Sequence, residues 1–445
     1  MQSQIQPKRA IVIGGSIAGL LSAKVLSEVF DEVSIVERDL ILEGAAERTG
    51  VPQSPQPHIL LTQGYRLLTS FFPEIRDDLR SAGAVPVDWG QDFQYFASGG
   101  WCENAADPTG LESFSCTRPL LESIVRNRVE QIENVSRLSP YRVEGLVGSA
   151  QKVVGVRCRG SKNKADERVL DADLVVDASG RSTNASTWLA NLGAAVPKAK
   201  TVDAQLGYAT GRYRIPADWN ENWKVLLIAH KPPEMTQLGY LARVENDELI
   251  ATLGGYCREY PPLVESEFVQ AAKELPDRAF YEAIAKSTLV SKIKAYRSTA
   301  NRLYRYEQLE TMPDGFVAIG DSVCALCPAY GQGLTTSAMS AVVLREWLPK
   351  RQHLELGETL SFQKKLAKQI KPAWDAATQS DAGFLQTDSD RKTPLLGRLL
   401  GAYMKKLAAK THTDSEVMVA FTRVTHMIDS PAKLLHPKII WKALT

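Results

Sequence analysis

A glycine-rich loop between a short apolar run and a helical segment constrains this chain more than any other feature. The loop lies within Ile11-Val-Ile-Gly-Gly-Ser-Ile-Ala-Gly-Leu20, after a run at 10–13 typical of a buried parallel strand and before helical spacing over 17–29. Gly14 allows the tight turn, and Gly19 lets the helix pack closely on the strand. The helix N-terminus then offers unpaired backbone N–H groups to a pyrophosphate, so the sequence predicts a dinucleotide-binding βαβ unit.

The second strand of this unit, at 33–37, ends in an acidic residue. Glu37 follows Gly19 by 18 residues, where a carboxylate can accept hydrogen bonds from both ribose hydroxyls. Ser16 replaces the usual middle glycine, but a small hydroxyl residue still lets a phosphate approach and can donate a hydrogen bond. A glycine turn in an unrelated α/β domain is the alternative. The two strands, the helix and Glu37 together favour a Rossmann-type unit.

Two further motifs place a carboxylate at the end of a strand. A strand at 316–319 runs into Asp321, and a loop with Gly331 and Gly333 and a helix over 334–348 follow. Such a carboxylate can bind sugar-alcohol hydroxyls, the glycines permit flat rings to approach the backbone, and the helix N-terminus can stabilise negative charge on a bound ring. A strand at 174–177 ends in Asp177 before Gly180, a pattern equally compatible with an ordinary β-turn.

Together these motifs resemble those of the class A flavoprotein monooxygenases, the FAD-dependent enzymes with the para-hydroxybenzoate hydroxylase fold. In that family the first loop binds the ADP pyrophosphate, the middle Asp-Gly motif lies near the pyrophosphate and supports use of FAD and NAD(P)H, and the Gly-Asp motif holds the ribityl chain. Asp-Ala-Ser-Gly at 177–180 departs from a plain Asp-Gly and weakens inference about NAD(P)H. With Arg118 at the family's Arg-x-x-Leu helix start, the resemblance implies these cofactor-binding residues: Gly14, Gly15, Ser16, Ala18, Gly19, Glu37, Arg38, Arg118, Asp177, Gly180, Arg181, Gly320, Asp321, Pro328, Gly331, Gly333 and Leu334.

A narrower likeness covers almost the whole chain. The segments at 50–58, 260–262, 300–302 and 328–333 look like a bacterial branch that includes polyether epoxidases and other natural-product oxidoreductases. The family places the loop that contains His58 close to the flavin, so the resemblance makes His58 a candidate contact of FAD or substrate. The alternative is a loop histidine satisfied by backbone groups, and the catalytic residues stay unknown.

The resemblance implies an α/β fold with a Rossmann-type FAD-binding domain, an inserted antiparallel β-sheet for the substrate, and C-terminal helices. Runs between 84–118 and 201–295 look strand-rich and are expected to pair as one antiparallel sheet. The FAD-binding domain is predicted over 1–83, 119–200 and 296–350, the substrate-binding sheet over 84–118 and 201–295, and the helical region over 351–445. One helical face there carries Leu395, Leu396, Leu399, Leu400, Tyr403, Met404 and Leu407.

The activity implied is that of an NAD(P)H-dependent monooxygenase. NAD(P)H reduces FAD, dioxygen adds at the flavin C4a, and one oxygen atom of the (hydro)peroxide hydroxylates or epoxidises an apolar aromatic or alkene, so no acid/base dyad is required. A single Rossmann fingerprint indicates that NAD(P)H binds transiently. The alternatives are a FAD-dependent reductase or dehydrogenase of the same fold and a non-catalytic flavin-binding module.

Several other features are set aside. Cys324-x-x-Cys327 lies inside the Gly-Asp motif without a thioredoxin-like context, and no further ligands complete a zinc site. The segment at 213–216 echoes a flavin-halogenase signature but lacks both tryptophans. His426 and His436 lie in the C-terminal tail and are interpreted as structural.

Composition bounds the partners. The 445 residues carry a formal charge of +2, which gives no argument for nucleic acid. No run of 18 uncharged apolar residues predicts a membrane span, and the N-terminus does not resemble a signal peptide, so a cytoplasmic protein is expected. The tail over 351–445 holds 15 Lys/Arg against 9 Asp/Glu. It could lie on a membrane surface, although a solvated face covering the substrate pocket is the commoner explanation.

Overall fold

The central sheet is formed by strands of Val, Ile, Leu and Ala, and these apolar side chains are buried on both faces. The computed structural model describes residues 7–162, 165–348, 358–385 and 395–445. The strand order is β20-β11-β1-β2-β7, and every neighbouring pair is parallel. The strands are β1 (Arg9–Ile13), β2 (Glu32–Val36), β7 (Val135–Leu138), β11 (Leu174–Asp177) and β20 (Phe316–Ala318). The predicted α/β class is confirmed, and the three strands that carry the motifs lie next to one another.

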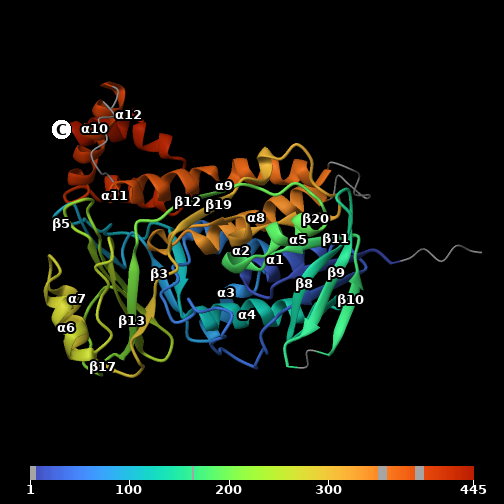
Figure 1. Ribbon diagram of the computed structural model, residues 1–445. Coiled ribbons are helices and arrows are strands. Elements are labelled where there is room, and N and C mark those ends of the chain that lie inside the picture. Colours follow the sequence, from blue (N-terminus) through green and yellow to red (C-terminus); the bar gives the residue numbers. More distant parts are fainter. Residues whose placement is uncertain (1–6, 163–164, 349–357, 386–394) are drawn as a thin grey trace, which may run out of the picture.

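Helices cover one face of this sheet, and a three-stranded antiparallel meander covers the other (Figure 1). Helix α1 (Ile17–Leu26) is buried almost all round because it packs on the sheet and contacts both α4 and α8. The other helices of this part are α2 (Thr62–Phe71), α3 (Ile75–Ser81), α4 (Arg118–Glu130), α5 (Ala185–Asn191) and α8 (Gly333–Trp347). The meander comprises β8 (Tyr141–Gly148), β9 (Val153–Gly160) and β10 (Glu167–Asp171).

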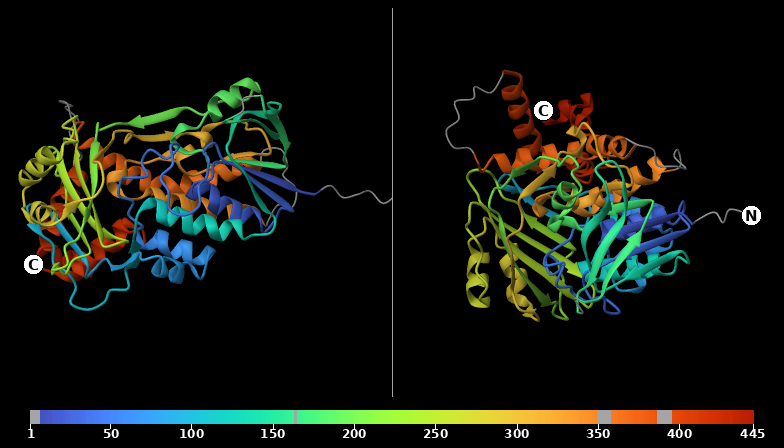
Figure 2. Two further views of the ribbon diagram at one scale, coloured as in Figure 1. Left: turned by 90° about the horizontal axis from the view of Figure 1, so that it is seen from below. Right: turned by 45° about the vertical axis from the view of Figure 1, so that its right-hand side comes forward.

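A second, larger sheet lies beside this framework (Figures 1 and 2). Its order is β17-β13-β16-β15-β14-β4-β5, and β18 also pairs with β13. The members are β4 (Phe93–Ala97), β5 (Gly100–Trp101), β13 (Gly207–Arg214), β14 (Val225–Ile228), β15 (Gln237–Val244), β16 (Glu248–Gly255), β17 (Thr288–Leu289) and β18 (Lys294–Tyr296). The two stretches predicted to form one sheet therefore do meet, through β4 and β14.

Three details of that expectation are wrong. Strand β4 pairs with β14 in parallel, not antiparallel, because the chain returns to the sheet only after a long excursion. Strands β3 (Val85–Asp88) and β6 (Glu112–Ser115) pair with each other in a separate ladder. Two helices, α6 (Glu265–Lys273) and α7 (Ala279–Lys286), occupy part of the stretch expected to be strands. Their buried Phe268, Ala272, Phe280 and Ile284 recur at helical spacing and pack on the large sheet.

A third sheet connects the two parts of the molecule. Its order is β12-β19-β21, and both pairs are antiparallel. The strands are β12 (Ala199–Val202), β19 (Asn301–Tyr304) and β21 (Cys324–Ala325). Strand β21 follows Asp321 closely, so this sheet helps to fix the loop that comes after β20.

The C-terminal helices divide into two groups. Helix α9 (Glu358–Ala382) packs on α8 and on β20, and Phe362, Leu366 and Trp374 join the core of the parallel sheet. Helices α10 (Leu395–Lys410), α11 (Ser415–Thr425) and α12 (Pro437–Leu444) share a small core of their own around Leu407 and Val417. On the predicted apolar face of α10, Leu399 and Leu400 are exposed, while the side chains of Leu395 and Leu396 lie outside the described residues.

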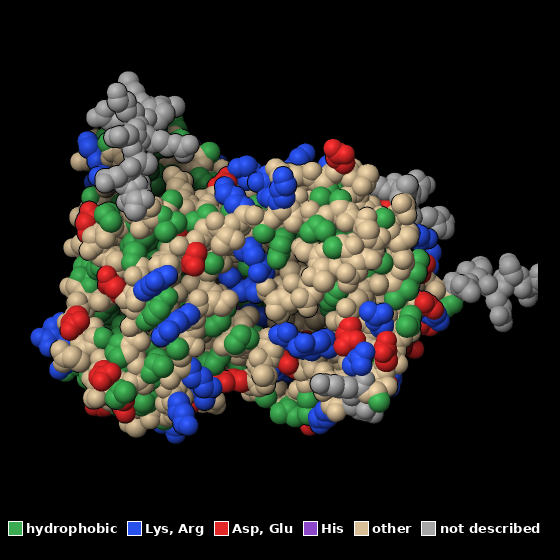
Figure 3. Space-filling view, in the orientation of Figure 1, with side chains coloured by type: hydrophobic (Ala, Val, Ile, Leu, Met, Phe, Trp, Pro, Cys, Tyr) green, Lys and Arg blue, Asp and Glu red, His purple; other side chains and the backbone are tan. Residues whose placement is uncertain are grey.

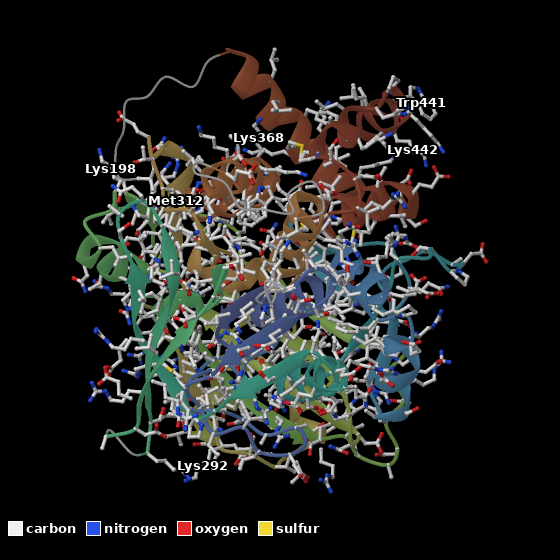
Figure 4. All side chains as sticks on the ribbon, turned by 90° about the vertical axis from the view of Figure 1, so that its right-hand side faces the viewer. Lys198, Lys292, Met312, Lys368, Trp441 and Lys442 are labelled. Atoms are coloured by element: carbon white, nitrogen blue, oxygen red, sulfur yellow. The ribbon has the colours of Figure 1, made fainter. Side chains whose placement is uncertain are left out.

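Figure 4 shows Lys368 on α9 and Trp441 and Lys442 on α12, at the outer end of this group. The Lys442 ammonium contacts Asp414 Oδ2 at 2.8 Å and Glu416 Oε2 at 3.0 Å, which ties α12 to the start of α11. On the face seen in Figure 3, Lys and Arg side chains gather over α9. None of the described helices is both long and apolar enough to cross a bilayer.

Candidate functional site

The loops that follow β1, β11 and β20 line two adjoining cavities. Cavity A has a volume of about 340 Å³, cavity B has a volume of about 300 Å³, and Ser16, Arg38 and Ser179 line both. Cavity A contains most of the residues that the family resemblance implies: Ser16, Ala18, Arg38, His58, Arg118, Gly180, Arg181, Asp321, Pro328, Gly331, Gly333 and Leu334. Cavity B adds Gly14, Gly15 and Glu37. Of the implied residues, Gly19, Asp177 and Gly320 line none of the cavities described here.

The β1–α1 loop owes its shape to two glycines. Gly14 has φ +101°, a left-handed conformation that side chains disfavour. At Gly19, an added Cβ would lie 1.8 Å from the Gly14 carbonyl oxygen, because helix and loop are in direct contact there. The close helix–strand packing expected of Gly19 is therefore present, and Gly19 contacts the loop without lining either cavity.

Helix α1 begins without a side-chain cap. Ser16 is its N-cap residue but makes no capping hydrogen bond. Its hydroxyl instead donates to Glu122 Oε2 at 2.7 Å and accepts from Arg118 Nη2 at 2.8 Å. In contrast, Thr117 caps α4 by accepting from the Leu120 N–H. The first N–H groups of α1 thus face cavity A uncapped, an arrangement that favours an anion.

A buried cluster of charges lies behind Ser16. Glu122 contacts Arg48, Arg118 and Arg126, with Nη–Oε distances of 3.4 Å for Arg118 and 3.6 Å for Arg126. Burial alone would raise the pKa of Glu122, but the three arginines and the Ser16 hydroxyl outweigh burial and lower it. The cluster therefore holds a carboxylate ionised and keeps positive charge beside the uncapped helix.

Arg48 also binds the acidic residue of the βαβ unit. Its Nη1 lies 3.1 Å from Glu37 Oε2, which accepts the Gly15 N–H at 2.7 Å as well. Glu37 Oε1 accepts the Asp39 N–H at 2.8 Å. Glu37 thus lines cavity B while bracing the loop. Sequence reasoning missed Arg48, since the irregular segment that contains it carries no spacing that would connect it to Glu122.

Asp321 follows β20 and lines cavity A as well. Its carboxylate accepts no hydrogen bond from any described residue, and its nearest cation is Arg181, with Nε at 3.8 Å from Oδ2. Burial raises the pKa of Asp321, and Arg181 and Arg118 oppose that effect. Arg181 itself is held by the carbonyls of Ala300 and Leu326. Asp321 is therefore a half-buried acceptor that lines a cavity and has no hydrogen-bond donor in the part of the chain that the structure describes.

Asp177 has a different role. Its side chain is fully buried and accepts from the hydroxyls of Ser179 at 2.6 Å and Thr183 at 2.5 Å, and from the Ser179 N–H at 2.9 Å. Burial raises its pKa, although these donors oppose the shift. Asp177 shapes the turn that brings Gly180 into cavity A without lining the cavity itself.

His58 lies in cavity A with its ring tautomer fixed. Nδ1 is 2.8 Å from the Gln56 carbonyl oxygen. Because a carbonyl only accepts, Nδ1 carries the proton and Nε2 is an acceptor in the neutral ring. Burial, assisted by Arg118, lowers the pKa of His58 to about 3, so the neutral form persists at pH 7. The Nδ1 atom is thus satisfied by backbone while the ring lines cavity A, and contact of His58 with FAD or substrate stays a prediction.

The loop at 328–333 separates cavity A from a third cavity. Cavity C has a volume of about 510 Å³ and shares Ile59 with cavity A. Pro328, Gly331 and Gly333 line cavity A, whereas Ala329, Tyr330 and Gln332 line cavity C. Gly331 has φ +64°, and this left-handed residue lets the loop alternate between the two sides. Much of the remaining wall of cavity C is apolar or aromatic, and it also includes Lys368, Gln369 and Asp429. The apolar and aromatic residues include Leu61, Trp89, Phe93, Tyr95, Leu227, Met339, Met418, Phe421 and Ile428.

The features set aside in the sequence occupy other places. Cys324 and Cys327 are buried free thiols, and burial raises the pKa of both, which disfavours the thiolate that dithiol chemistry needs. Within the described residues, no group of three or more His, Cys, Asp or Glu side chains is placed to hold a metal ion. Tyr213, in the halogenase-like segment, is buried against Phe268 and lines none of the three cavities. His426, in contrast, lines cavity C.

A known protein resembles this chain in sequence over almost the whole length of both. No family model matches the chain. The chain is 30% identical over 442 residues to Protein Rv3254 of Mycobacterium tuberculosis, and the alignment covers 98% of this chain and 93% of that protein.

Solved structures share the fold at low sequence identity. A flavoprotein/dehydrogenase from Cytophaga hutchinsonii has a TM-score of 0.68 and 13% identity, with 97% of this chain and 96% of that chain covered. The p-nitrophenol 4-monooxygenase PnpA from Pseudomonas putida DLL-E4 has a TM-score of 0.65 and 16% identity, with 93% and 97% covered. A triple mutant of the flavin-dependent brominase Bmp2 has a TM-score of 0.63 and 13% identity, with 98% and 99% covered. The predicted class A monooxygenase fold is confirmed.

Proposed function

The chain belongs to the family of the mycobacterial Protein Rv3254 and has the fold of class A FAD-dependent monooxygenases, and from this premise we propose that it is a FAD-dependent oxidoreductase. The observation that carries the proposal is the loop at 328–333, which places the motif-lined cavity A back to back with the apolar cavity C. A redox ring in one cavity and an apolar substrate in the other would meet across a single stretch of chain.

Unsatisfied polar groups around cavity A fit FAD. The Nε atom of Arg118 is buried without a hydrogen-bond partner, α1 begins uncapped, and Asp321 lacks a donor among the described residues. In this proposal the pyrophosphate binds the N-terminus of α1 beside Arg118. The Asp321 carboxylate binds ribityl hydroxyls, and Glu37 in cavity B accepts from the adenosine ribose.

The finer activity proposed is insertion of one oxygen atom into an apolar aromatic or alkene, with NAD(P)H as reductant. When bound, FAD supplies electron transfer from NAD(P)H and the activation of dioxygen. The chain's own part is to bind the substrate in cavity C, whose aromatic and aliphatic side chains offer an apolar surface. The uncapped N-terminus of α8 at Gly333, which lines cavity A, would stabilise negative charge on a reduced ring. A cytoplasmic location is part of the same proposal.

The test begins with the cofactor. Purified protein is titrated with FAD, and then incubated with FAD, NADPH or NADH, labelled dioxygen and a panel of aromatics and polyenes. We expect labelled oxygen in a product. After subtraction of the NAD(P)H oxidised without substrate, one labelled atom should be incorporated for each NAD(P)H oxidised. Failure to bind FAD would overturn the whole proposal.

The other outcomes separate the rival functions. A reduced product formed from NAD(P)H under anaerobic conditions would identify a reductase or dehydrogenase of the same fold. FAD binding without NAD(P)H oxidation on any member of the panel would favour a non-catalytic flavin-binding module. Both results would overturn oxygen insertion while leaving the assignment of cavity A in place.

A further inference from the structure

His426 joins the end of α11 to the start of α2. Thr62 is the first residue of α2, and its N–H, which no intrahelical carbonyl can accept, donates to His426 Nδ1 at 3.2 Å. The Thr62 hydroxyl lies 3.1 Å from the same nitrogen. The N–H of Gln63 donates to the His426 carbonyl oxygen at 3.4 Å. His426 therefore satisfies two donors at a helix N-terminus 364 residues away in the sequence.

This contact fixes the tautomer of the ring. A backbone N–H only donates, so Nδ1 must be the acceptor and the neutral ring carries its proton on Nε2. Burial lowers the pKa of His426 to about 3, so the ring is neutral across the physiological range. Its orientation is further restrained by the Trp89 ring, whose centroid is 4.6 Å away.

The Nε2–H group has no hydrogen-bond partner among the described residues, and the side chain lines cavity C. The residue as a whole is only 4% exposed. Two other polar atoms in the same cavity wall, Gln332 Oε1 and Thr422 Oγ1, are buried without partners. An apolar cavity with a few unpartnered polar groups is the usual form of a small-molecule site.

We propose that His426 is a specificity-determining residue, and that its Nε2–H donates a hydrogen bond to an oxygen acceptor on the substrate held in cavity C. The substrate class is then an apolar ring or polyene that carries a carbonyl or phenolic oxygen, not a plain hydrocarbon. The inference rests on the proposed function only in taking cavity C as the substrate's, and it concerns binding, not turnover.

The closing experiment compares two probes that differ by one oxygen. Binding of 1-tetralone, which carries a carbonyl acceptor, and of tetralin, which lacks it, is measured by equilibrium dialysis on the full chain with and without FAD. The variant His426→Asn keeps an acceptor in place of Nδ1 for the Thr62 N–H, and its shorter side chain places no donor at the position of Nε2. The matched control is His436→Asn, because His436 likewise accepts a backbone N–H, from Lys438 at 3.3 Å, but is exposed outside the cavity.

The quantity that decides is the ratio of the tetralone and tetralin affinities, in which changes of cavity volume cancel. We expect His426→Asn to lower this ratio by about fivefold to tenfold, the effect of one hydrogen bond, and His436→Asn to leave it unchanged. An unchanged ratio in His426→Asn, an equal fall in His436→Asn, or no binding of either probe would overturn the inference.

The two proposals fail separately. If FAD does not bind but the tetralone ratio falls in His426→Asn, the flavin assignment is wrong and the role of His426 stands. If labelled oxygen enters a product but the ratio does not change, the oxidoreductase assignment stands and His426 does not read the substrate.

Discussion

At the scale of single residues, the Glu122 carboxylate contacts three buried arginines. Glu122→Gln would leave Arg48, Arg118 and Arg126 with less counter-charge in a region where water cannot compensate. We expect the free energy of unfolding without FAD to fall by about 3 kcal/mol, measured by urea denaturation at pH 7.

The control for this variant is Glu112→Gln. Glu112 pairs with Arg76 at 3.4 Å, but both side chains are about half exposed. Water screens such a pair, so the expected change is about 0.5 kcal/mol or less. Equal losses in the two variants would show that the buried cluster is not a network.

For Asp321, unlike Glu122, we expect a substitution to weaken FAD binding without destabilising the FAD-free protein. Because its carboxylate accepts no hydrogen bond from the described residues, Asp321→Asn should leave the melting temperature of the FAD-free protein unchanged or raise it. FAD affinity should fall by about tenfold to a hundredfold, the effect of losing charge-assisted hydrogen bonds to hydroxyls. Fluorescence titration with FAD and a thermal melt measure the two effects. The exposed Asp218 provides the control, Asp218→Asn, and a loss of stability without a loss of affinity in Asp321→Asn would contradict the assignment.

At the scale of elements, two glycines in helices predict changes of opposite sign. In α1, a Cβ at Gly19 would meet the Gly14 carbonyl, so Gly19→Ala should destabilise the protein and weaken FAD binding by displacing the loop. In α10, nothing lies within 4 Å of a Cβ at Gly401, so Gly401→Ala should stabilise the protein by up to about 1 kcal/mol through helix propensity. Chemical denaturation of both variants is the measurement. Stabilisation by Gly19→Ala would mean that Gly19 is not in close contact with the Gly14 carbonyl.

The elements also show where sequence reasoning ends. The βαβ unit around Gly14 and the strands before Asp177 and Asp321 follow from local patterns, since turn chemistry and burial act over a few residues. The parallel pairing of β4 with β14 does not, because it depends on where the chain goes between 97 and 225. Helices α6 and α7 were missed because charged and apolar residues at helical spacing also break into short strand-like runs.

The same distinction applies to the site. Residues inside glycine motifs, such as Ser16 and Gly331, can be found from spacing alone. Arg48 reaches Glu122 across 74 residues, and His426 reaches Thr62 across 364, so no local pattern links them. Both lie in segments without a motif. Tertiary packing alone converts them from an ordinary loop arginine and a tail histidine into parts of cavity walls.

At the scale of the whole molecule, buried neutral histidine predicts sensitivity to acid. The pKa of His426 is about 3 in the folded chain against an ordinary 6.5. Below about pH 6.5 the unfolded chain takes up a proton that the folded chain refuses, so stability is lost as pH falls, by up to about 1.4 kcal/mol per pH unit. The difference in unfolding free energy between wild type and His426→Asn should therefore shift by about that amount between pH 6 and pH 5.

Two features keep this comparison specific. The lowered pKa of Glu122 adds its own acid sensitivity only below its ordinary value of 4.5. His58 and His230 also have lowered pKa values, but they are present in both proteins and cancel in the difference. A difference that does not vary between pH 6 and pH 5 would mean that the His426 ring is accessible to protons in the folded state.

The loop at 328–333 lines both cavity A and cavity C, so binding in one cavity is expected to be coupled to binding in the other. With FAD in one and a substrate in the other, each occupant would alter the same backbone, and linkage requires the effects to be reciprocal. A substrate that binds the reduced form tenfold more tightly must raise the two-electron midpoint potential by about 30 mV. The midpoint potential of a flavin in cavity A would then depend on which substrate occupies cavity C, on the other side of Gly331.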